Sequence, residues 1–330
     1  MKCIKVKKQE AESVRKKLLD EGNLNKDYAI NRDKDFVYLP VLKKVIGYKI
    51  VEKTLPSLKK ETSLKEALKK ELSKKELEQL KTSMDVVGTI AILEIDKELR
   101  KHEKKIAQTL LKINKQIKTV VRKEGEHTGL YRIQDYTYLA GEKTFETIHK
   151  ENGAQFYLDI TRTYFSVRLS TDRLRIAQQI KNNELVLVMF SGIGVYPIVF
   201  SKHSKAKEIY GIELNPDAHE YGEKNLQLNK TNNVFLFCGD VREVATHLGR
   251  QFDRILMPLP HGAEQFLPLL SQISKKGATI HYYTIAQEDE FDNQKELIKK
   301  YYPKAKIIDI IKCGQPSPRT YRICIEFILN

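Results

Sequence analysis

The chain has 330 residues, more than a single domain usually contains, so two or three domains are expected. No apolar run is long enough to span a membrane and the first residues lack a signal-peptide pattern, which argues against a membrane protein and predicts a cytoplasmic one. The formal charge of +15 favours a polyanionic partner such as nucleic acid, although a lysine-rich solvated surface would give the same charge.

The first segment, residues 1–55, predicts a small N-terminal domain of mixed α and β structure. A helix is expected over about 8–21, and turn-forming residues then lead to a strand at 36–39 that Pro40 should end. A stretch rich in lysine and glutamate separates this domain from the next.

Residues 60–165 predict an α+β domain. The capping-box patterns Ser63-x-x-Glu66 and Ser73-x-x-Glu76 indicate two consecutive helices. Leucines 64, 68 and 72 should share one face of the first helix. The elements expected after these helices are a strand at 89–95, a helix at 97–115, a strand at 116–122 and short strands up to 159.

Residues 166–330 alternate strand and helix, which is typical of a parallel sheet with crossover helices. The expected strands are 185–190, 208–212, 234–238, 254–257 and 277–283. Ligands of open α/β sheets bind outside the carboxyl ends of the strands. Those ends here carry a glycine-containing turn, Glu213, Asp240 and a loop at Pro258.

These strand ends suit a nucleoside ligand. Gly192 and Gly194 let the backbone approach a ligand closely, Glu213 can accept hydrogen bonds from both ribose hydroxyls, and Asp240 can accept one from an adenine amino group. The third glycine of a dinucleotide fingerprint is absent, because Pro197 stands there and offers no N–H to a pyrophosphate. The set therefore predicts S-adenosylmethionine as cofactor and a Rossmann-like class I methyltransferase domain.

Several longer motifs extend this prediction to a family. They are 147–153 (Thr-Ile-His-Lys-Glu-Asn-Gly), 164–169 (Tyr-Phe-Ser-x-Arg-Leu), 190–194 (Phe-Ser-Gly-Ile-Gly), 212–216 (Ile-Glu-Leu-Asn-Pro), 239–243 (Gly-Asp-Val-Arg-Glu) and 281–283 (His-Tyr-Tyr). With these motifs the chain resembles the archaeal tRNA (guanine-37) N1-methyltransferase family. The resemblance covers nearly the whole chain, and is looser over the first 60 residues.

The resemblance implies an enzyme that binds the anticodon stem-loop of tRNA and methylates the purine 3′ of the anticodon. It implies that Arg132 stabilises charge on the base and that Asp172 is the general base. Arg132 could instead contact a phosphate, and Asp172 could cap a helix that begins near Arg173. The cofactor contacts expected from the motifs and the resemblance are Arg173, Phe190, Gly192, Gly194, Glu213, Leu214, Asp240, Val241 and Pro258.

One departure from the family pattern concerns the target base. The family usually has asparagine where this chain has Pro258, and proline offers no side-chain donor to a guanine edge. The change is similar to a branch of the family that acts in wyosine synthesis and methylates carbon 7 of 4-demethylwyosine, giving isowyosine. We therefore expect methylation of that carbon as well as of guanine N1, and a chain that methylates guanine N1 alone is the alternative. Pro258 is accordingly counted among the catalytic residues.

Further expectations concern substrate contacts, metals and rival functions. The candidate substrate-binding residues are Tyr164, Phe165, Arg168 and Tyr196, of which the three aromatic residues could equally belong to the core. The four cysteines lack paired spacing, so no metal site is expected, and the chain should be a monomer. Two rival functions are a nicotinamide-dependent enzyme and a non-catalytic RNA-binding protein.

Overall fold

The computed structural model describes residues 1–57 and 63–330. These residues form two compact units, 1–67 and 68–330. Residues 60–62, which the sequence assigns to the second domain, lie outside the described part. Among the described residues, no helix is both long enough and apolar enough to cross a membrane.

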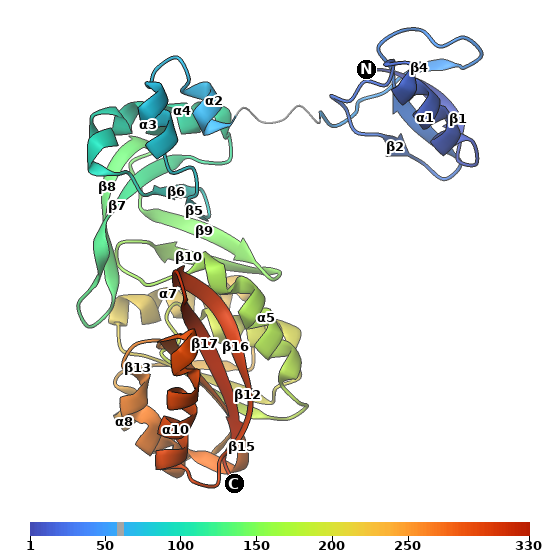
Figure 1. Ribbon diagram of the computed structural model, residues 1–330. Helices are drawn as coiled ribbons and strands as arrows, with labels where there is room; N and C mark the ends of the chain where they lie inside the picture. The colour runs from blue at the N-terminus through green and yellow to red at the C-terminus, as the bar shows by residue number, and fades with distance from the viewer. Residues whose placement is uncertain (58–62) are drawn as a thin grey trace. The chain divides into compact units, whose positions relative to one another are not determined.

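The N-terminal unit contains a four-stranded antiparallel sheet and one main helix (Figure 1). Its elements are β1 Lys2–Lys7, α1 Ala11–Asp20, β2 Asn31–Arg32, β3 Phe36–Pro40 and β4 Ile50–Glu52, with strand order β2-β3-β1-β4. The predicted helix and strand are present within three residues, although β3 includes Pro40. Strand β1 was not predicted, and its Ile4 and Val6 pack with Leu18 of α1 in the core.

The two capping-box patterns have different outcomes. Ser73 caps α3, Lys74–Gln79, with both halves of the box: its hydroxyl accepts from the Glu76 amide, and the Glu76 carboxylate accepts from the Ser73 amide at 2.9 Å. At Ser63 the hydroxyl accepts from the Glu66 amide at 3.2 Å, and α2 spans only Leu64–Ala67. The first helix is therefore shorter than predicted, although the three leucines at 64, 68 and 72 are all buried.

The second unit begins with a four-stranded sheet and a helix. Its elements are β5 Asp85–Val87, β6 Ile90–Leu93, the 3-10 helix η1 Lys97–His102, α4 Glu103–Ile113, β7 Thr119–Thr128 and β8 Ile133–Gly141, followed by the hairpin β9 Glu146–Glu151 and β10 Ala154–Asp159. Strands β6 and β7 are parallel and α4 connects them, while β7 and β8 form a long antiparallel hairpin that extends well beyond α4 (Figure 1). The loop of this hairpin, residues 129–132, reaches the site described below.

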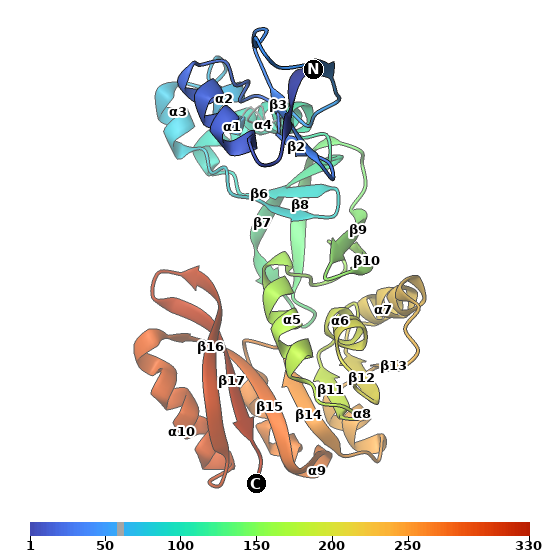
Figure 2. The ribbon, with the colours of Figure 1, turned by 90° about the vertical axis from the view of Figure 1, so that its right-hand side faces the viewer.

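The C-terminal part is a seven-stranded sheet with the order β13-β12-β11-β14-β15-β17-β16 (Figure 2). Its strands are β11 Leu185–Met189, β12 Glu208–Glu213, β13 Val234–Cys238, β14 Phe252–Met257, β15 Ser274–Gln287, β16 Lys306–Ser317 and β17 Thr320–Ile328. Its helices are η2 Val167–Leu169, α5 Ser170–Gln179, α6 Val195–His203, α7 Pro216–Asn229, α8 Val241–His247, η3 Ala263–Leu269, α9 Leu270–Ile273, η4 Glu288–Glu290 and α10 Phe291–Tyr301. The five predicted strands and their parallel pairing are confirmed, whereas α10 and the antiparallel pair β16 and β17 were not predicted.

Strand β11 shows how the sheet holds its position between two hydrophobic layers. Successive side chains of a strand point to opposite faces, so Val186 and Val188 join one core cluster while Leu187 and Met189 join the other. All four are fully buried, as expected for a central strand of a sheet covered on both faces. Because β12 and β14 flank β11 in parallel, the carboxyl ends of the three strands meet at one edge of the sheet.

Candidate cofactor and substrate site

A cleft of about 350 Å³ lies at the carboxyl ends of β11 to β14, and we call it the cofactor cleft. The predicted residues that line it are Arg132, Tyr164, Phe190, Gly192, Glu213, Leu214, Asp240, Val241 and Pro258. Arg132 comes from the β7–β8 loop and Tyr164 from the segment after β10, so both parts of the second unit contribute walls. The volume is within the range of sites for small organic ligands.

The glycine turn after β11 leaves one wall of the cleft open. Phe190, Gly192 and Gly194 all have positive φ, at 60°, 56° and 80°. A Cβ on Gly192 would meet nothing nearer than the Tyr164 carbonyl oxygen at 3.8 Å, so the space in front of this backbone is available to a ligand. Gly194 is not among the residues that line the cleft; a Cβ on it would meet the Ile198 and Leu236 side chains at 3.4 Å, and it precedes the first residue of α6. Its positive φ favours glycine in the turn, and a cofactor contact at Gly194 stays a prediction.

Glu213, the last residue of β12, connects this strand to the glycine turn after β11. Its carboxylate accepts hydrogen bonds from the Gly192 amide at 2.7 Å and the Asn215 amide at 2.8 Å. Burial raises the pKa of Glu213, and these backbone donors act in the opposite direction. A carboxylate has about four acceptor positions, so two remain for the hydroxyls of a ribose. The residue therefore fits the cofactor and also holds the turn that faces it.

Asp240 follows β13 and caps α8. Its carboxylate accepts from the Arg242 backbone amide at 2.8 Å and from the Arg242 side chain at 3.0 Å. The hydrogen bond from the Arg242 side chain is the main cause that lowers the pKa of Asp240, so the group is an acceptor at neutral pH. The Asp240 carboxylate can therefore cap α8 and also accept a hydrogen bond from a ligand.

Arg132 occupies a loop position with a φ of 53° and faces the cleft beside Tyr164 and His261. Burial lowers the pKa of Arg132, the nearby Tyr164 opposes this shift, and the positive charge of Arg322 adds to it. Burial, Arg132 and Arg322 also lower the pKa of His261, which keeps that imidazole neutral at pH 7. His261 was missed by sequence reasoning. The only signal for it was its position directly after the Pro258 loop.

Besides Gly194, Phe165 and Arg168, three buried residues of the predicted site do not line the cofactor cleft: Asp172, Arg173 and Tyr196. Asp172 is buried inside the first turn of α5, where it accepts from the Tyr283 hydroxyl and pairs with Arg175 at 2.7 Å. Since α5 begins at Ser170, the alternative that Asp172 caps this helix is wrong.

The other two are core residues in the structure. Arg173 forms a buried ion pair with Glu151 at 2.7 Å and donates to the Ser166 carbonyl oxygen at 2.7 Å, so its donors are used between the two parts of the unit. Tyr196 is buried with ring contacts to Phe200 and Tyr283, which fits the alternative that it belongs to the core. A cofactor contact by Arg173 and a substrate contact by Tyr196 stay predictions.

The segment 164–168 lines a second cavity of about 280 Å³, which lies between the β5–β8 sheet and the β16–β17 hairpin. Tyr164 lines both this second cavity and the cofactor cleft. Phe165 packs on His149 with ring centroids 5.0 Å apart, and Arg168 pairs with Asp85 at 2.9 Å.

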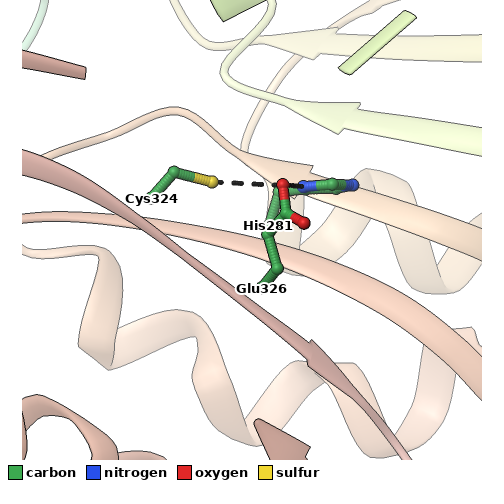
Figure 3. Close-up of side chains that lie close together, drawn as sticks. All are labelled: His281, Cys324 and Glu326. Carbon is green, nitrogen blue, oxygen red and sulfur yellow. Dashed lines mark hydrogen bonds and ion pairs between the residues drawn. The ribbon is translucent and has the colours of Figure 1, made fainter. Parts of the chain in front are cut away.

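One buried group of residues could be mistaken for a metal centre. In the described part of the chain, ligand atoms of His281, Cys324 and Glu326 lie within 4.8 Å of one another, and Figure 3 shows the three side chains converging from β15 and β17. Arg254 approaches His281 Nε2 at 2.6 Å, and because arginine only donates, Nε2 must accept and Nδ1 carries the proton toward Glu326 at 3.3 Å. A second arginine, Arg175, pairs with Glu326. Arg254 and Arg175 already supply the positive charge that a metal ion would bring to these side chains. The group is therefore a hydrogen-bonded network.

The fold and the cofactor cleft together define a Rossmann-like methyltransferase. Family models match residues 147–311 as the TRM5/TYW2 methyltransferase domain, 64–144 as the TYW2 N-terminal domain and 3–49 as the tRNA methyltransferase 5 N-terminal domain. The tRNA (guanine(37)-N(1))-methyltransferase Trm5b of Pyrococcus abyssi is 34% identical, with 98% of each chain covered. The chain therefore belongs to the TRM5/TYW2 methyltransferase family.

Relatives with wyosine names are also similar. The tRNA 4-demethylwyosine(37)-methyltransferase Taw21 of Saccharolobus solfataricus is 31% identical over 75% of this chain and 94% of its own. The tRNA (guanine(37)-N(1))/4-demethylwyosine(37)-methyltransferase Taw22 of Nanoarchaeum equitans is 31% identical over 75% of this chain and 99% of its own.

Two solved structures relate the fold to its ligands. A complex of aTrm5 and tRNALeu matches with a TM-score of 0.76 and 34% identity, covering 99% of both chains. Methanocaldococcus jannaschii Trm5 in complex with adenosine matches with a TM-score of 0.70 and 32% identity, covering 100% of this chain and 99% of its own. The chain is an S-adenosylmethionine-dependent tRNA methyltransferase, which sets aside the nicotinamide enzyme and the non-catalytic RNA-binding protein.

Proposed function

We propose that this enzyme methylates the purine at position 37, 3′ of the anticodon, on carbon 7 of 4-demethylwyosine to give isowyosine, and also on guanine N1. The observation that carries the proposal is Pro258, which lines the cofactor cleft together with Leu259 and Pro260. None of the three offers a side-chain hydrogen-bond donor or acceptor. A tricyclic base has lost the free N1–H and amino edge of guanine, so a wall of this kind suits it better. The names of Taw21 and Taw22 support this substrate, and the name of Trm5b supports guanine.

The transfer requires alignment, charge control and removal of one proton. S-adenosylmethionine supplies a methyl group on a sulfonium, whose sulfur keeps the electron pair of the breaking bond. The cleft walls hold the acceptor atom in line with that methyl group. The hydrogen on carbon 7 or N1 would leave as a proton ahead of the new bond, and the electron pair left behind would be shared between that atom and the carbonyl oxygen of the base. Arg132, at the cleft wall, would stabilise the negative charge on this oxygen until the acceptor atom has formed its bond to the methyl carbon.

Asp172 is the proposed proton acceptor. In the structure both of its oxygens are engaged, by Tyr283 and Arg175, and it lies outside the cofactor cleft. The proposal therefore requires this side chain to exchange one of those partners for the substrate when tRNA binds. If Asp172 keeps its partners during the reaction, its role is to hold α5 against β15.

The N-terminal unit is proposed to contact tRNA, and the enzyme to act as a monomer on the anticodon stem-loop. The loop between β3 and β4 exposes Leu42 and Ile46, by 60% and 95%, beside two lysines. Apolar side chains next to cations suit a surface of unstacked bases and phosphates. The affinity for tRNA should therefore fall steeply as salt concentration rises, and a flat salt profile would contradict the proposal.

The decisive experiment offers the enzyme guanine-37 tRNA and 4-demethylwyosine-37 tRNA in competition and identifies the methylated nucleosides by mass. The unmodified enzyme should prefer the tricyclic base, and Pro258→Asn should shift the preference toward guanine because asparagine restores a donor and an acceptor. Pro303→Asn, at an exposed turn, is the matched control and should leave the preference unchanged. If only N1-methylguanosine forms, the enzyme is a plain guanine-37 N1-methyltransferase.

A further inference from the structure

The second cavity is separate from the cofactor cleft and shares one lining residue, Tyr164, with it. Its walls come from four separate segments of the second unit: 83–94, 123–136, 164–168 and 313–322. Two of its aromatic residues, Tyr136 and Tyr164, are candidates for stacking, and Lys123 and Arg322 add positive charge. Burial raises the pKa of Tyr136 to about 12, so its hydroxyl keeps its proton.

Two polar atoms of the cavity wall have no hydrogen-bond partner among residues 1–57 and 63–330. Gln134 is 2% exposed, and its side-chain amide nitrogen donates to the carbonyl oxygens of Glu124 and Asp135. This orientation is unambiguous, because the opposite one would place an oxygen against two carbonyl oxygens. Gln134 Oε1 is left without a donor, and Arg322 Nε is left without an acceptor, although Arg322 Nη2 donates to the Tyr164 hydroxyl at 3.4 Å.

Unmatched buried polar groups are costly, and such groups in a native structure indicate a missing partner. A purely apolar ligand would satisfy neither atom, and a phosphate would satisfy Arg322 but would repel the Gln134 oxygen. A nucleobase offers both an N–H donor and a lone-pair acceptor on its edge, and its flat faces suit the two tyrosine rings. The chemistry of the wall therefore matches a base.

We propose that the second cavity binds the base of a nucleotide adjacent to the target in the tRNA loop. Tyr164 lines both the cofactor cleft and the second cavity, so the two occupants are separated by one side chain. Adjacent nucleotides of one unstacked strand can bridge that separation. Holding the neighbouring base would fix the register of the strand and place the target base in the cofactor cleft. This inference rests on the tRNA substrate and not on which atom of the target is methylated.

The test measures kcat/KM for methyl incorporation with three tRNAs: the intact one, and two that are abasic immediately 5′ or 3′ of the target. In the unmodified enzyme, removing the base that fills the cavity should lower kcat/KM about tenfold, the scale of one stacked and bonded base. In Gln134→Leu and in Tyr136→Ala, removing the same base should cost less than threefold, because its binding partners are already gone. Gln116→Leu, an exposed glutamine of the same part of the chain, should retain the full tenfold loss.

The variants are first checked for unchanged S-adenosylmethionine affinity, which shows that the C-terminal part is folded. The fold-losses in kcat/KM from base removal and from substitution could prove independent at both neighbouring positions, so that they multiply. In that case the cavity binds no adjacent base and the proposal is wrong. Failure of the proposed wyosine activity looks different, because methyl incorporation into guanine-37 tRNA would persist and only the product would change.

Discussion

Carboxylates serve two distinct regions of the C-terminal sheet, and their surroundings give them different tasks. In the cofactor cleft, Glu213 accepts from two backbone amides, and Asp240 accepts from the backbone amide of Arg242 and pairs with its exposed guanidinium. In the buried network described above, each carboxylate is paired with an arginine that is itself largely buried. The network runs Glu184–Arg254–His281–Glu326–Arg175–Asp172–Tyr283 across β14, β15, β17 and α5.

The two regions differ in how much folding free energy is lost when one partner of a carboxylate is removed. Charges in the network have left water and are stabilised only by their partners, so loss of one partner leaves another charge buried and unpaired. Hydrogen bonds from His281 and Arg175 hold the pKa of Glu326 at about 2 against the opposing effect of burial. The cleft carboxylates instead line a cavity that a ligand can enter. Substitutions in the network should therefore change stability, and substitutions in the cleft should change binding or rate.

The largest expected effect is on Arg254, whose ion pair with Glu184 spans 2.8 Å with both side chains nearly inaccessible. Arg254→Leu should lower the free energy of unfolding by about 3–5 kcal/mol, because Glu184 keeps a buried charge without a partner. Denaturant unfolding measures this value. Arg250→Leu, which removes a loose and exposed pair with Glu208 at 3.9 Å, is the control and should cost less than about 1 kcal/mol. Equal losses in the two variants would show that burial does not set the cost of breaking these ion pairs.

Arg132→Ala should lower single-turnover methyl transfer about 10²-fold, since it removes the cation that would stabilise negative charge on the carbonyl oxygen of the base. The affinity for S-adenosylmethionine and the unfolding free energy should stay close to those of the unmodified enzyme. Near-normal turnover would make Arg132 a phosphate contact.

Asp172 belongs to the buried network and is also the proposed proton acceptor. Its substitution can therefore change both the stability and the rate. Asp172→Asn should lower single-turnover transfer by a similar 10²-fold if the carboxylate accepts the proton. Rates are compared at a temperature where circular dichroism shows the variant fully folded. A stable, folded variant with normal turnover would assign Asp172 to the network alone.

Glu213→Ala should weaken S-adenosylmethionine binding by roughly 1.5–3 kcal/mol, the usual value of hydrogen bonds to a charged group. Titration calorimetry gives the affinity directly. Glu213→Gln is the informative partner variant, because its amide keeps one acceptor and should lose less. Unchanged affinity in both would contradict the assignment of this carboxylate to the cofactor.

The smallest effect is expected at Arg168, whose ion pair with Asp85 at 2.9 Å is exposed. Arg168→Ala should change the unfolding free energy by only about 0.2–1 kcal/mol. Arg162→Ala, which breaks another exposed pair with Asp217, is the matched control. If Arg168 also contacts the substrate, its loss should raise KM for tRNA while Arg162→Ala should not. If Arg168→Ala lowered the unfolding free energy by more than about 2 kcal/mol, Arg168 would contribute to stability as the buried arginines of the network do.

The sequence by itself determined the strand-end chemistry of this protein. Parallel strands bring their carboxyl ends to one edge of the sheet, so the order of the glycine turn, Glu213 and Asp240 along the chain was enough to place them together. The same local reasoning identified the capping box at Ser73 and the alternation of strands and helices. The capping box and each strand end depend on residues a few positions apart, and the parallel order of the strands then brings the strand ends together.

Only the tertiary structure decided which side chains meet across long sequence separations. The antiparallel return of β16 and β17 brings Glu326 to His281 and Arg175, and it also closes the second cavity against segments more than 140 residues earlier in the chain. The sequence predicted a carboxylate near the start of α5. Only the structure shows that the Asp172 carboxylate points to Tyr283 on β15, from which it accepts a hydrogen bond. Side-chain pairing of this kind has no local period in the sequence, because it is set by how distant elements pack once the sheet is complete.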